Sequence, residues 1–490
     1  MFVAFDNFPA LLIWLPLLSG LICFFIKEQR AAKAWSLFSS IVTLTLMVVS
    51  LFYNDSKYYA LNSVSYVWLP DIGSSFSLML DGMSRILCLL TAISFPIIFV
   101  STYYADYKKA NSFYGLMLLT QCGLMGVFMS MDALVFYFFW ELALIPAYFL
   151  ASQWGGEKRI QSAFKFFIYT FAGSLFLLIG IIYIYLQTPN QSFSMVTFYN
   201  AILPAKDQAW VFWFFFIAFA IKMPIFPFHT WQPDVYEQSP TAVTMVLSGI
   251  MVKMGVFALL RWLLVLFPDA VRQYDNILIG LAVVGMLYAS CIALVQDDLK
   301  RLVAYSSIAH IGLMAAAIFT MNEVSVQGVM IQMFSHGINI IGMWIVIYLI
   351  ETQTGIRKIS QLGGLAQTAP VLAIMLVIIA LANIALPLTN AFVGEFMMFS
   401  GLFKFNHWYA AAAGLSIILA AIYTLNMVKN VFYGNLNSVT AAFRDIRMHE
   451  KLVLAVIVVM IFFIGVYPAP LFDLVKVSTE VIMSRVAEGK

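Results

Sequence analysis

The sequence contains few charged residues. Only 10% of its 490 residues are Asp, Glu, Lys or Arg, whereas 62% are hydrophobic, and a soluble domain carries about 25% charged residues. The mean hydropathy of +0.91 agrees with this imbalance. The net charge is only +3, and no basic stretch interleaved with aromatic residues is present, so nucleic acid is not an expected partner. The composition excludes a soluble domain and predicts a membrane protein.

Cysteine is equally scarce. The four cysteines are Cys23, Cys88, Cys122 and Cys291. They lie far apart in apolar segments without C-x-x-C spacing, which argues against a disulfide framework, a zinc site or an iron–sulfur cluster. Neither a glycine-rich phosphate loop nor a pair of haem ligands is evident. We therefore expect no metal and no cofactor in this chain.

Long apolar runs follow one another along the whole sequence. A helix needs about 20 mostly apolar residues to span a bilayer. We predict an all-α polytopic membrane protein with about 14 transmembrane helices. Their expected positions are 8–26, 35–53, 76–101, 112–130, 133–153, 162–187, 210–229, 241–266, 276–296, 301–320, 325–350, 369–403, 408–433 and 451–472.

Two of these spans contain proline-based breaks. The run 369–403 is too long for one straight span and contains Pro387 in its middle, and span 7 contains Pro224 and Pro227. Proline removes a backbone donor and interrupts a helix. A broken helix within a membrane is tolerated where it is buried or lines a hydrated cavity. We therefore expect spans 7 and 12 to be broken helices with a functional role.

The distribution of basic residues predicts the orientation. With the N-terminus outside, the inner loops hold about twice as many Lys and Arg residues as the outer ones, as the positive-inside rule requires. Both termini are then expected on the outer, periplasmic side. The first apolar run is followed by the basic residues Lys27, Arg30 and Lys33. A signal peptide has its basic residues in front of the apolar run, so we do not expect the first span to be a cleaved signal peptide. The loops are short, so extramembrane chemistry is expected in partner chains.

Four ionisable residues lie inside the apolar runs: Glu141, Lys222, Lys253 and Glu395. A charge in the hydrocarbon region costs at least about 2.5–3.5 kcal/mol, and such residues usually mark an ion or proton path. Two acids and two lysines are all titratable, which favours proton movement. The alternative is a set of static buried ion pairs or neutral acids, which proteins can tolerate without any transport role.

Three histidines form a second group of candidates. His310 and His336 lie in successive spans, between Lys253 and Glu395 in chain order, and His229 follows the first break. Imidazole accepts and releases protons near neutral pH. A single histidine in an apolar helix is more often a hydrogen-bonded core residue. The pair in successive spans favours a relay, and His229 is a candidate on the entry side.

Two further charged positions have simpler interpretations. The segment from Asp81 to Arg85 opens the third span, where we expect a helix start with a local ion pair. Arg261 lies two turns after Lys253, nearer the helix end. There we expect it to extend toward the surface or to form an ion pair.

The motifs, taken together and in order, resemble the antiporter-like subunits of respiratory complex I and of multisubunit cation/proton antiporters. The resemblance is strongest between about 80 and 435. It implies two inverted five-helix repeats, spans 4–8 and 9–13, and hence four parts, 1–110, 111–267, 268–435 and 436–490. The motifs that carry it are Phe139-Trp140-Glu141, Lys222-Met-Pro224, His229-x-Trp231-x-Pro233-Asp234, Pro240-Thr-Ala, Gln296-x-Asp298-x-Lys300-Arg301-Leu-x-Ala-Tyr-Ser and Phe392-x-Gly394-Glu395-Phe.

The resemblance also assigns roles to residues. Glu141 matches the family's span-5 glutamate, Lys222 the span-7 lysine and Lys253 the central lysine of span 8. Glu395 matches the terminal residue of span 12, where a glutamate is typical of the M-type subunits of NADH:quinone oxidoreductase. The sequence departs from the family at Tyr236, where a second histidine is common. Leu388 and Asn390 also replace glycines that are common in the second break.

This resemblance implies a proton-translocating subunit of NADH:quinone oxidoreductase in the bacterial inner membrane. The expected partners are L-type and N-type antiporter-like subunits, small membrane subunits and the lipid bilayer. NADH, FMN, iron–sulfur clusters and quinone are expected in partner subunits. Two alternatives remain, a subunit of a multisubunit Na⁺/H⁺ antiporter and a subunit of a membrane-bound hydrogenase.

A mechanism follows as a hypothesis. Burial favours the neutral amine of a lysine, and a nearby carboxylate favours the ammonium form. If Glu141 and Lys222 move apart, the proton of Lys222 is expected to leave toward Lys253. The relay would continue through water, His310 and His336 to Glu395, and from there to the outside.

Overall fold

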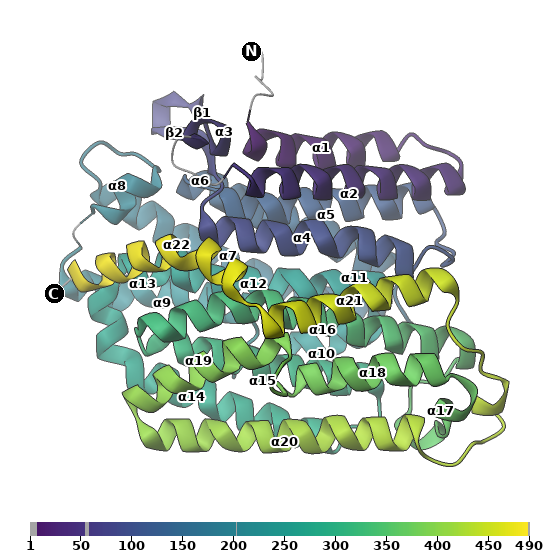
Figure 1. Cartoon of the computed structure of the whole chain (residues 1–490). Helices are drawn as coiled ribbons and strands as arrows, with labels where there is room; N and C mark the ends of the chain where they lie inside the picture. The colour runs from purple at the N-terminus through teal and green to yellow at the C-terminus, as the bar shows by residue number, and fades with distance from the viewer. Residues whose placement is uncertain (1–6, 54–57, 202, 489–490) are drawn as a thin grey trace. The chain divides into compact units, whose positions relative to one another are not determined.

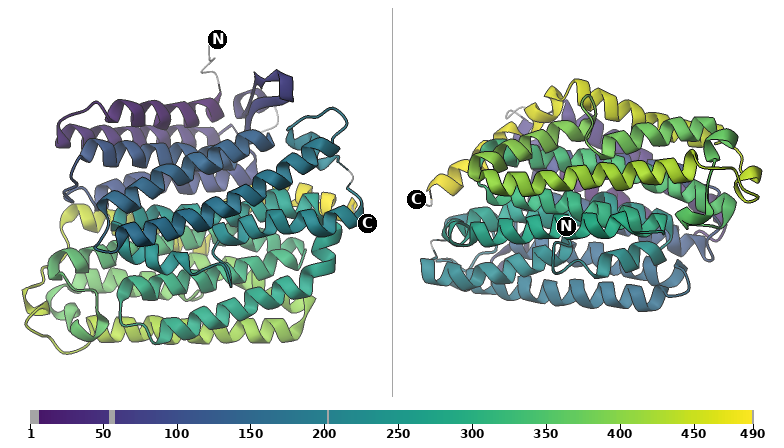
Figure 2. Two further views of the ribbon diagram at one scale, coloured as in Figure 1. Left: turned by 180° about the vertical axis from the view of Figure 1, so that it is seen from behind. Right: turned by 90° about the horizontal axis from the view of Figure 1, so that it is seen from below.

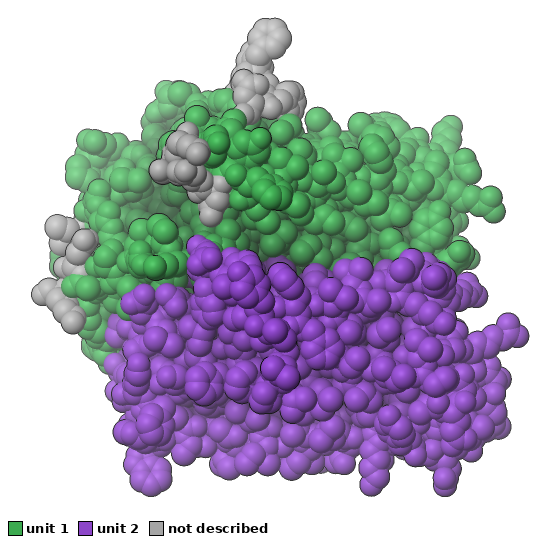
Figure 3. All heavy atoms as spheres, in the orientation of Figure 1, with its two compact units in different colours: residues 1–223, 250–274, 474–490 green, residues 224–249, 275–473 purple. Residues whose placement is uncertain are grey.

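The structure is a computed structural model that describes residues 7–53, 58–201 and 203–488. Almost all of the described chain is helical (Figure 1). It divides into two compact units (Figure 3), of which unit 1 comprises residues 1–223, 250–274 and 474–490, and unit 2 comprises residues 224–249 and 275–473.

Unit 1 contains the N-terminal helices and a short hairpin. Its elements are α1 (Phe8–Cys23), α2 (Gln29–Leu51), α3 (Tyr59–Asn62), β1 (Ser63–Leu69), β2 (Ser74–Met79), α4 (Gly82–Ser101), α5 (Ala110–Met129), α6 (Ala133–Trp154), α7 (Arg159–Gln187), α8 (Met195–Tyr199), α9 (Ala205–Lys222), α12 (Val252–Ala258) and α13 (Leu264–Leu266).

Unit 2 contains most of the later helices. They are α10 (Trp231–Gln238), α11 (Thr241–Val246), α15 (Leu299–Phe319), α16 (Glu323–Thr354), α17 (Leu365–Thr368), α18 (Pro370–Asn383), α19 (Asn390–Phe405), α20 (His407–Phe432) and α21 (Met448–Val466). Within this unit α18, α19 and α20 pack side by side (Figures 1 and 2). Helices α14 (Pro268–Leu294) and α22 (Ala469–Glu488) contribute residues to both units.

Long apolar helices dominate, as predicted. In the described ranges, 11 helical segments are long and apolar enough to cross a membrane, and two shorter apolar helices, Phe8–Cys23 and Pro370–Asn383, accompany them. The total of 14 transmembrane helices remains a prediction. A span that is short or broken in the middle is not counted among the 11, because none of its helices is long and apolar enough to cross the membrane alone. The four-part division of the chain by repeat also remains a prediction.

A β-hairpin precedes α4 and was not predicted. Strands β1 and β2 pair antiparallel, with Ser63 opposite Met79 and Val67 opposite Ser75. The expected span 76–101 therefore begins later, at Gly82, because its first residues belong to β2. The C-terminal segment beyond Pro468 forms the 20-residue helix α22. The chain termini, placed outside by the charge argument, lie beyond the described residues.

Asp132 connects this hairpin to α6. Its carboxylate accepts hydrogen bonds from the backbone N–H groups of Leu134 and Val135 at the start of α6, and from Ser74 and Ser75 of β2. A carboxylate in this position satisfies donors that a helix start leaves unpaired. Burial raises the pKa of Asp132 above its ordinary value, although the four hydrogen bonds favour the ionised form. The start of the helix that carries Glu141 is thus fixed by one buried acid.

Both predicted helix breaks are present. Helix α9 ends at Lys222 and α10 begins at Trp231. Helix α18 ends at Asn383 and α19 begins at Asn390. In the second break Leu388 has φ of +73°, a left-handed conformation that glycine adopts without strain and leucine does not.

Span 8 is irregular on both sides of Lys253. The helical run Thr241–Leu266 contains two π-helical segments, Leu247–Met251 and Leu259–Leu263, and α12 with Lys253 lies between them. Such segments are rare and occur often at functional sites. The apolar part of this span is completely buried. Lys253 and the two π-helical segments beside it therefore lie in the protein interior.

Candidate functional site

Unit 1 brings Glu141 and Lys222 into one electrostatic neighbourhood. Lys222 is the last residue of α9 and is 1% exposed. Its Nζ lies 5.3 Å from the centre of the Trp140 ring, within the range of a cation–π interaction. Glu141, next to Trp140 on α6, is close enough to interact with the Lys222 charge. Lys222 therefore faces the Phe139-Trp140-Glu141 motif that was identified from the sequence.

The two side chains do not hold each other by hydrogen bonds. Neither Lys222 Nζ nor Glu141 Oε1 has a hydrogen-bond partner among the described residues. The Glu141 carboxyl instead interacts with the Ser174 hydroxyl of α7, which also interacts with the Tyr137 hydroxyl. Glu141 and Lys222 are thus neighbours with separate local contacts. Such an arrangement permits a movement between two lysine positions.

Lys253 lies on a helix that packs very closely against α9. It is fully buried. A Cβ atom added to Gly255 would lie 2.7 Å from the carbonyl oxygen of Phe219 in α9, so only glycine permits this approach. The close packing brings the backbone that carries Lys253 next to the end of α9 that carries Lys222.

A buried ion pair lies elsewhere in unit 1 and corrects one expectation. Asp81 pairs with Arg261 through two hydrogen bonds, of which Arg261 Nη2 to Asp81 Oδ1 measures 2.7 Å. Arg85 instead donates to the carbonyl oxygens of Leu80 and Ser50. The predicted local pair was therefore wrong in its partner, because Arg85 turns toward two backbone carbonyl groups and Asp81 pairs with Arg261.

The Asp81 carboxylate is stabilised as an anion. Burial alone would raise its pKa, but the Arg261 guanidinium and the hydrogen bonds from Arg261 and Ser84 outweigh burial and hold the pKa of Asp81 below its ordinary value. The Ser84 backbone N–H and hydroxyl donate to Asp81 Oδ1 at 2.9 and 2.8 Å. Arg261 thus forms the ion pair that was one of its two expected roles.

Unit 2 brings three of the predicted residues together. His310 Nδ1 lies 3.0 Å from Glu395 Oε1, and Gln332 Nε2 donates to the same oxygen at 3.1 Å. The rings of His310 and His336 are 5.4 Å apart. His310, His336 and Glu395 are all buried, between 2% and 8% exposed. Residues from α15, α16 and α19 thus converge on one carboxylate.

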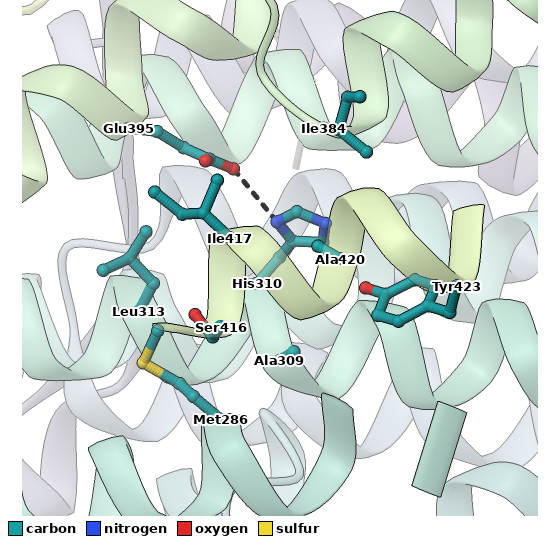
Figure 4. A pocket seen from close by; sticks show the side chains of 10 residues that line it. All are labelled: Met286, Ala309, His310, Leu313, Ile384, Glu395, Ser416, Ile417, Ala420 and Tyr423. Atoms are coloured by element: carbon teal, nitrogen blue, oxygen red, sulfur yellow. Dashed lines mark hydrogen bonds and ion pairs between the residues drawn. The ribbon is translucent and has the colours of Figure 1, made fainter. Parts of the chain in front are cut away.

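Several polar residues of this region were not predicted. The Tyr423 hydroxyl of α20 donates to Ser306 Oγ at 3.0 Å, and Asn383 Nδ2 donates to the same oxygen at 3.3 Å. Tyr423, together with His310 and Glu395, lines a small pocket, and His310 is drawn between the other two (Figure 4). One signal could have found these residues: uncharged polar side chains buried in apolar spans.

His229 occupies an aromatic setting in unit 2. It is 4% exposed, and its ring lies 5.8 Å from that of Phe226 and 5.3 Å from that of Tyr288. Tyr236, where relatives often have a histidine, is fully buried and its ring lies 6.0 Å from that of Trp344. The entry-side role of His229 remains a prediction.

No group of three or more His, Cys, Asp or Glu residues in the described ranges is arranged to hold a metal ion. Cys23, Cys88 and Cys122 are buried and Cys291 is exposed. The carboxylates, amines and imidazoles of Glu141, Glu395, Lys222, Lys253, His310 and His336 are groups suited to acid–base chemistry.

Comparison with known proteins assigns the family. Residues 130–422 match the family described as NADH:quinone oxidoreductase/Mrp antiporter, TM. The NADH-quinone oxidoreductase subunit M of Rickettsia prowazekii is 35% identical over 477 residues, 96% of this chain and 97% of the relative. The F(420)H(2) dehydrogenase subunit M of Methanosarcina mazei is 33% identical over 488 residues, 98% of each chain.

Solved structures agree with the sequence relatives. A chain of respiratory complex I from Thermus thermophilus matches with a TM-score of 0.91 and 28% identity, covering 98% of this chain and 99% of that one. A chain of the Mrp complex from Dietzia sp. matches with a TM-score of 0.84 at 19% identity, covering 99% of this chain and 100% of that one, and shows the shared fold. The chain belongs to the NADH:quinone oxidoreductase/Mrp antiporter family of transmembrane subunits.

Proposed function

We propose that this chain is the proton-translocating, M-type membrane subunit of an NADH:quinone oxidoreductase in a bacterial inner membrane. One observation carries the proposal most strongly. Glu395, buried in the interior of unit 2, is contacted by both His310 and Gln332, and the His336 ring lies 5.4 Å from that of His310. Intramembrane ionisable residues in such clusters mark proton relays. The M-type relatives, similar over almost their whole length, support the same assignment.

In unit 1 the proposed step is a switch at Lys222. Its ammonium group lies over the Trp140 ring and interacts with the Glu141 charge, and the proposed second position brings it into direct contact with the Glu141 carboxylate. Movement between the two changes how strongly the amine holds its proton. We assign Lys253 as the next acceptor, since its helix packs on the end of α9.

In unit 2 the proposed relay ends at Glu395. His310 can take a proton on one ring nitrogen and release one from the other, and its Nδ1 faces the Glu395 carboxylate. When Glu395 is ionised, a proton on His310 Nδ1 forms a charge-assisted hydrogen bond with it. Transfer of that proton to Glu395 leaves a neutral imidazole, which accepts a hydrogen bond from the carboxylic acid, and the charge assistance is lost. His336 and His229 are assigned to the same pathway, His229 at its entry.

The energy for translocation comes from partner chains in this proposal. Moving one proton against the membrane potential costs about 2.3 kcal/mol per 100 mV, and this chain is assigned no redox centre. NADH, FMN, iron–sulfur clusters and quinone belong to other subunits. The L-type and N-type subunits and small membrane subunits are its neighbours, and both termini are placed on the periplasmic side.

The test measures NADH-driven acidification in everted membrane vesicles that contain the whole complex. Glu141→Gln and Lys222→Ala should abolish the part of the proton flux that depends on this chain while leaving assembly and NADH oxidation measurable. Glu157→Gln, in an exposed loop of the same unit, is the matched control and should pump normally. A normal proton-to-electron ratio in either buried-site variant would overturn the assignment.

A further inference from the structure

Two cavities in unit 2 meet at a single side chain, Tyr423. The inner one is the pocket of His310 and Glu395, also lined by Met286, Ala309 and Ser416 (Figure 4), and its volume of about 10 Å³ is the size of about one water molecule. The outer one is an open cleft of about 500 Å³. Tyr423 is 2% exposed and lines both.

The outer cleft has a polar lining. It lies where α14 ends and the chain turns into α15, and it also contacts the last two turns of α20. Its polar lining residues are Gln296, Asp297, Ser360, Asn426 and Asn430. Asp297, Ser360 and both asparagines are exposed. Ser360 donates two hydrogen bonds to the Asp297 carboxylate, and the exposed polar groups along the cleft make it accessible to water.

The cleft and the pocket follow one face of the same two helices. On α20 the lining residues Ser416, Ala420, Tyr423, Met427 and Asn430 recur every three or four positions, which is the spacing of one helix face. On α15, Leu302 lines the cleft and His310 lines the pocket, two helical turns apart. Tyr423 lies about 14 Å from the end of α20 by helical rise, nine residues from Phe432.

A hydrogen bond holds the Tyr423 side chain, which lines both cavities, against α15. The Tyr423 hydroxyl donates to Ser306 Oγ at 3.0 Å, and Ser306 lies on α15 one turn from His310. His310 Nε2, the ring nitrogen that does not face Glu395, has no hydrogen-bond partner among the described residues. Buried polar atoms of this kind normally bind a protein group or water. The pocket therefore offers a site for water beside the histidine.

We propose that Tyr423 gates a water path from the outer cleft to the His310–Glu395 pair. When the Tyr423–Ser306 hydrogen bond opens, water connects the cleft to His310, and the His310–Glu395 pair can exchange protons with this end of unit 2. The inference rests on the proposed proton function and adds an access route to it. The open cleft along α19 and the start of α20 is lined mainly by Phe396, Phe399 and Phe403, so it offers no comparable polar route.

The test uses cysteine accessibility in the whole complex in membrane vesicles. Cys291 is replaced by Ser to remove the exposed native thiol, and single cysteines are placed at Asn430 and Asn426 in the cleft and at Ser416 in the pocket. A membrane-impermeant thiol reagent is added from each face in turn, and the mass of this chain reports labelling. Ala420→Cys replaces Ser416→Cys if the latter does not assemble.

We expect Asn430→Cys and Asn426→Cys to react from the face that bears the 295–297 turn. Ser416→Cys should react slowly with Tyr423 in place and about fivefold faster, or more, with Tyr423→Ala, because one hydrogen bond and the ring are lost. Tyr409→Phe, near the other end of α20, is the matched control and should leave the rate unchanged.

Three results would overturn the gate: no labelling in the cleft, labelling of Ser416→Cys from the opposite face only, or a rate that Tyr423→Ala does not change. The outcome is independent of the pumping test. Loss of pumping in Lys222→Ala without any gate effect would leave the proposed function standing and the path wrong. If the cysteines are labelled as expected but Lys222→Ala pumps normally, the water path stands and the proposed function is wrong.

Discussion

At the scale of single residues, the buried charges are not equivalent, because each has a different local partner. Lys222 faces the Trp140 ring, Glu395 faces His310 and Gln332, and Asp81 faces Arg261. The first two settings leave a titratable group with room to change partner. The Asp81 pair is held by a bidentate contact and two hydrogen bonds from Ser84, which is the pattern of a structural pair.

Replacing Trp140 with Leu should weaken proton translocation without preventing assembly. The substitution removes the ring beneath Lys222 Nζ, and a cation–π contact is worth about 0.5–2 kcal/mol, or about two- to thirtyfold in the balance between two lysine positions. We expect a several-fold lower rate of NADH-driven acidification in vesicles. Trp408→Leu, which replaces an 84% exposed tryptophan, is the control. Equal pumping in Trp140→Leu and the control would remove Trp140 from the switch.

Asp81→Asn should destabilise the protein in a pH-dependent way. The pKa of Asp81 is lower in the folded chain than its ordinary value of about 3.9. The ionised carboxylate therefore adds stability above that value, and this contribution is lost as pH falls through the lower, folded pKa. Removing one partner of a buried pair costs about 3–5 kcal/mol, so the variant should have a lower thermal midpoint at pH 7.

The measurement is the thermal midpoint of the detergent-solubilised complex. Unfolding is monitored by tryptophan fluorescence at a series of pH values from 7 downward. The difference between wild type and Asp81→Asn should stay constant to about pH 4 and shrink below it. Asp71→Asn, in the exposed turn between β1 and β2, should show no difference at any pH. A difference that grows on acidification would contradict the assigned sign.

At the scale of elements, the sequence allowed the two helix breaks to be predicted. It did not allow the contacts between residues of different helices to be predicted. Prolines near Lys222 and Glu395 pointed to the breaks between α9 and α10 and between α18 and α19. Proline alone does not decide a break, because Pro96 and Pro146 lie inside continuous helices. The pairing of Asp81 with Arg261 joins residues 180 positions apart, and tertiary packing alone decides it. Tyr423 was missed for the same reason, since its partner Ser306 lies on α15 and nothing local distinguishes it among 23 tyrosines.

Leu388→Gly should stabilise the second break. Leu388 has φ of +73° and its side chain is 65% exposed, so little packing is lost. A left-handed conformation costs a non-glycine residue about 1–2 kcal/mol, and glycine offsets part of the gain through the entropy of the unfolded chain. We expect a small rise in the thermal midpoint of the purified complex. Leu386→Gly, two residues earlier and without a positive φ, should lower it.

At the scale of the whole molecule, the described residues include buried groups that can bind protons, and the proposed function assigns the energy for moving protons to partner chains. It belongs to a family whose relatives include subunits of NADH-quinone oxidoreductase and of F(420)H(2) dehydrogenase, and its fold recurs in an Mrp complex. The names of the two sequence relatives differ in the electron donor, NADH or F(420)H(2). The identity of the driving partner, and not the buried relay, therefore separates the proposed function from its alternatives.

Purification in mild detergent should yield this chain with flavin and iron–sulfur subunits and with other antiporter-like chains. Everted vesicles should acidify on addition of NADH, because redox chemistry in the partners supplies the roughly 2.3 kcal/mol per 100 mV that each proton requires. They should show no pH change when a salt gradient is imposed without NADH. A salt-driven pH change, with only small membrane chains in the purified complex, would favour the Na⁺/H⁺ antiporter instead. Acidification that needs a donor other than NADH would keep the proton relay and reassign the electron-input subunits.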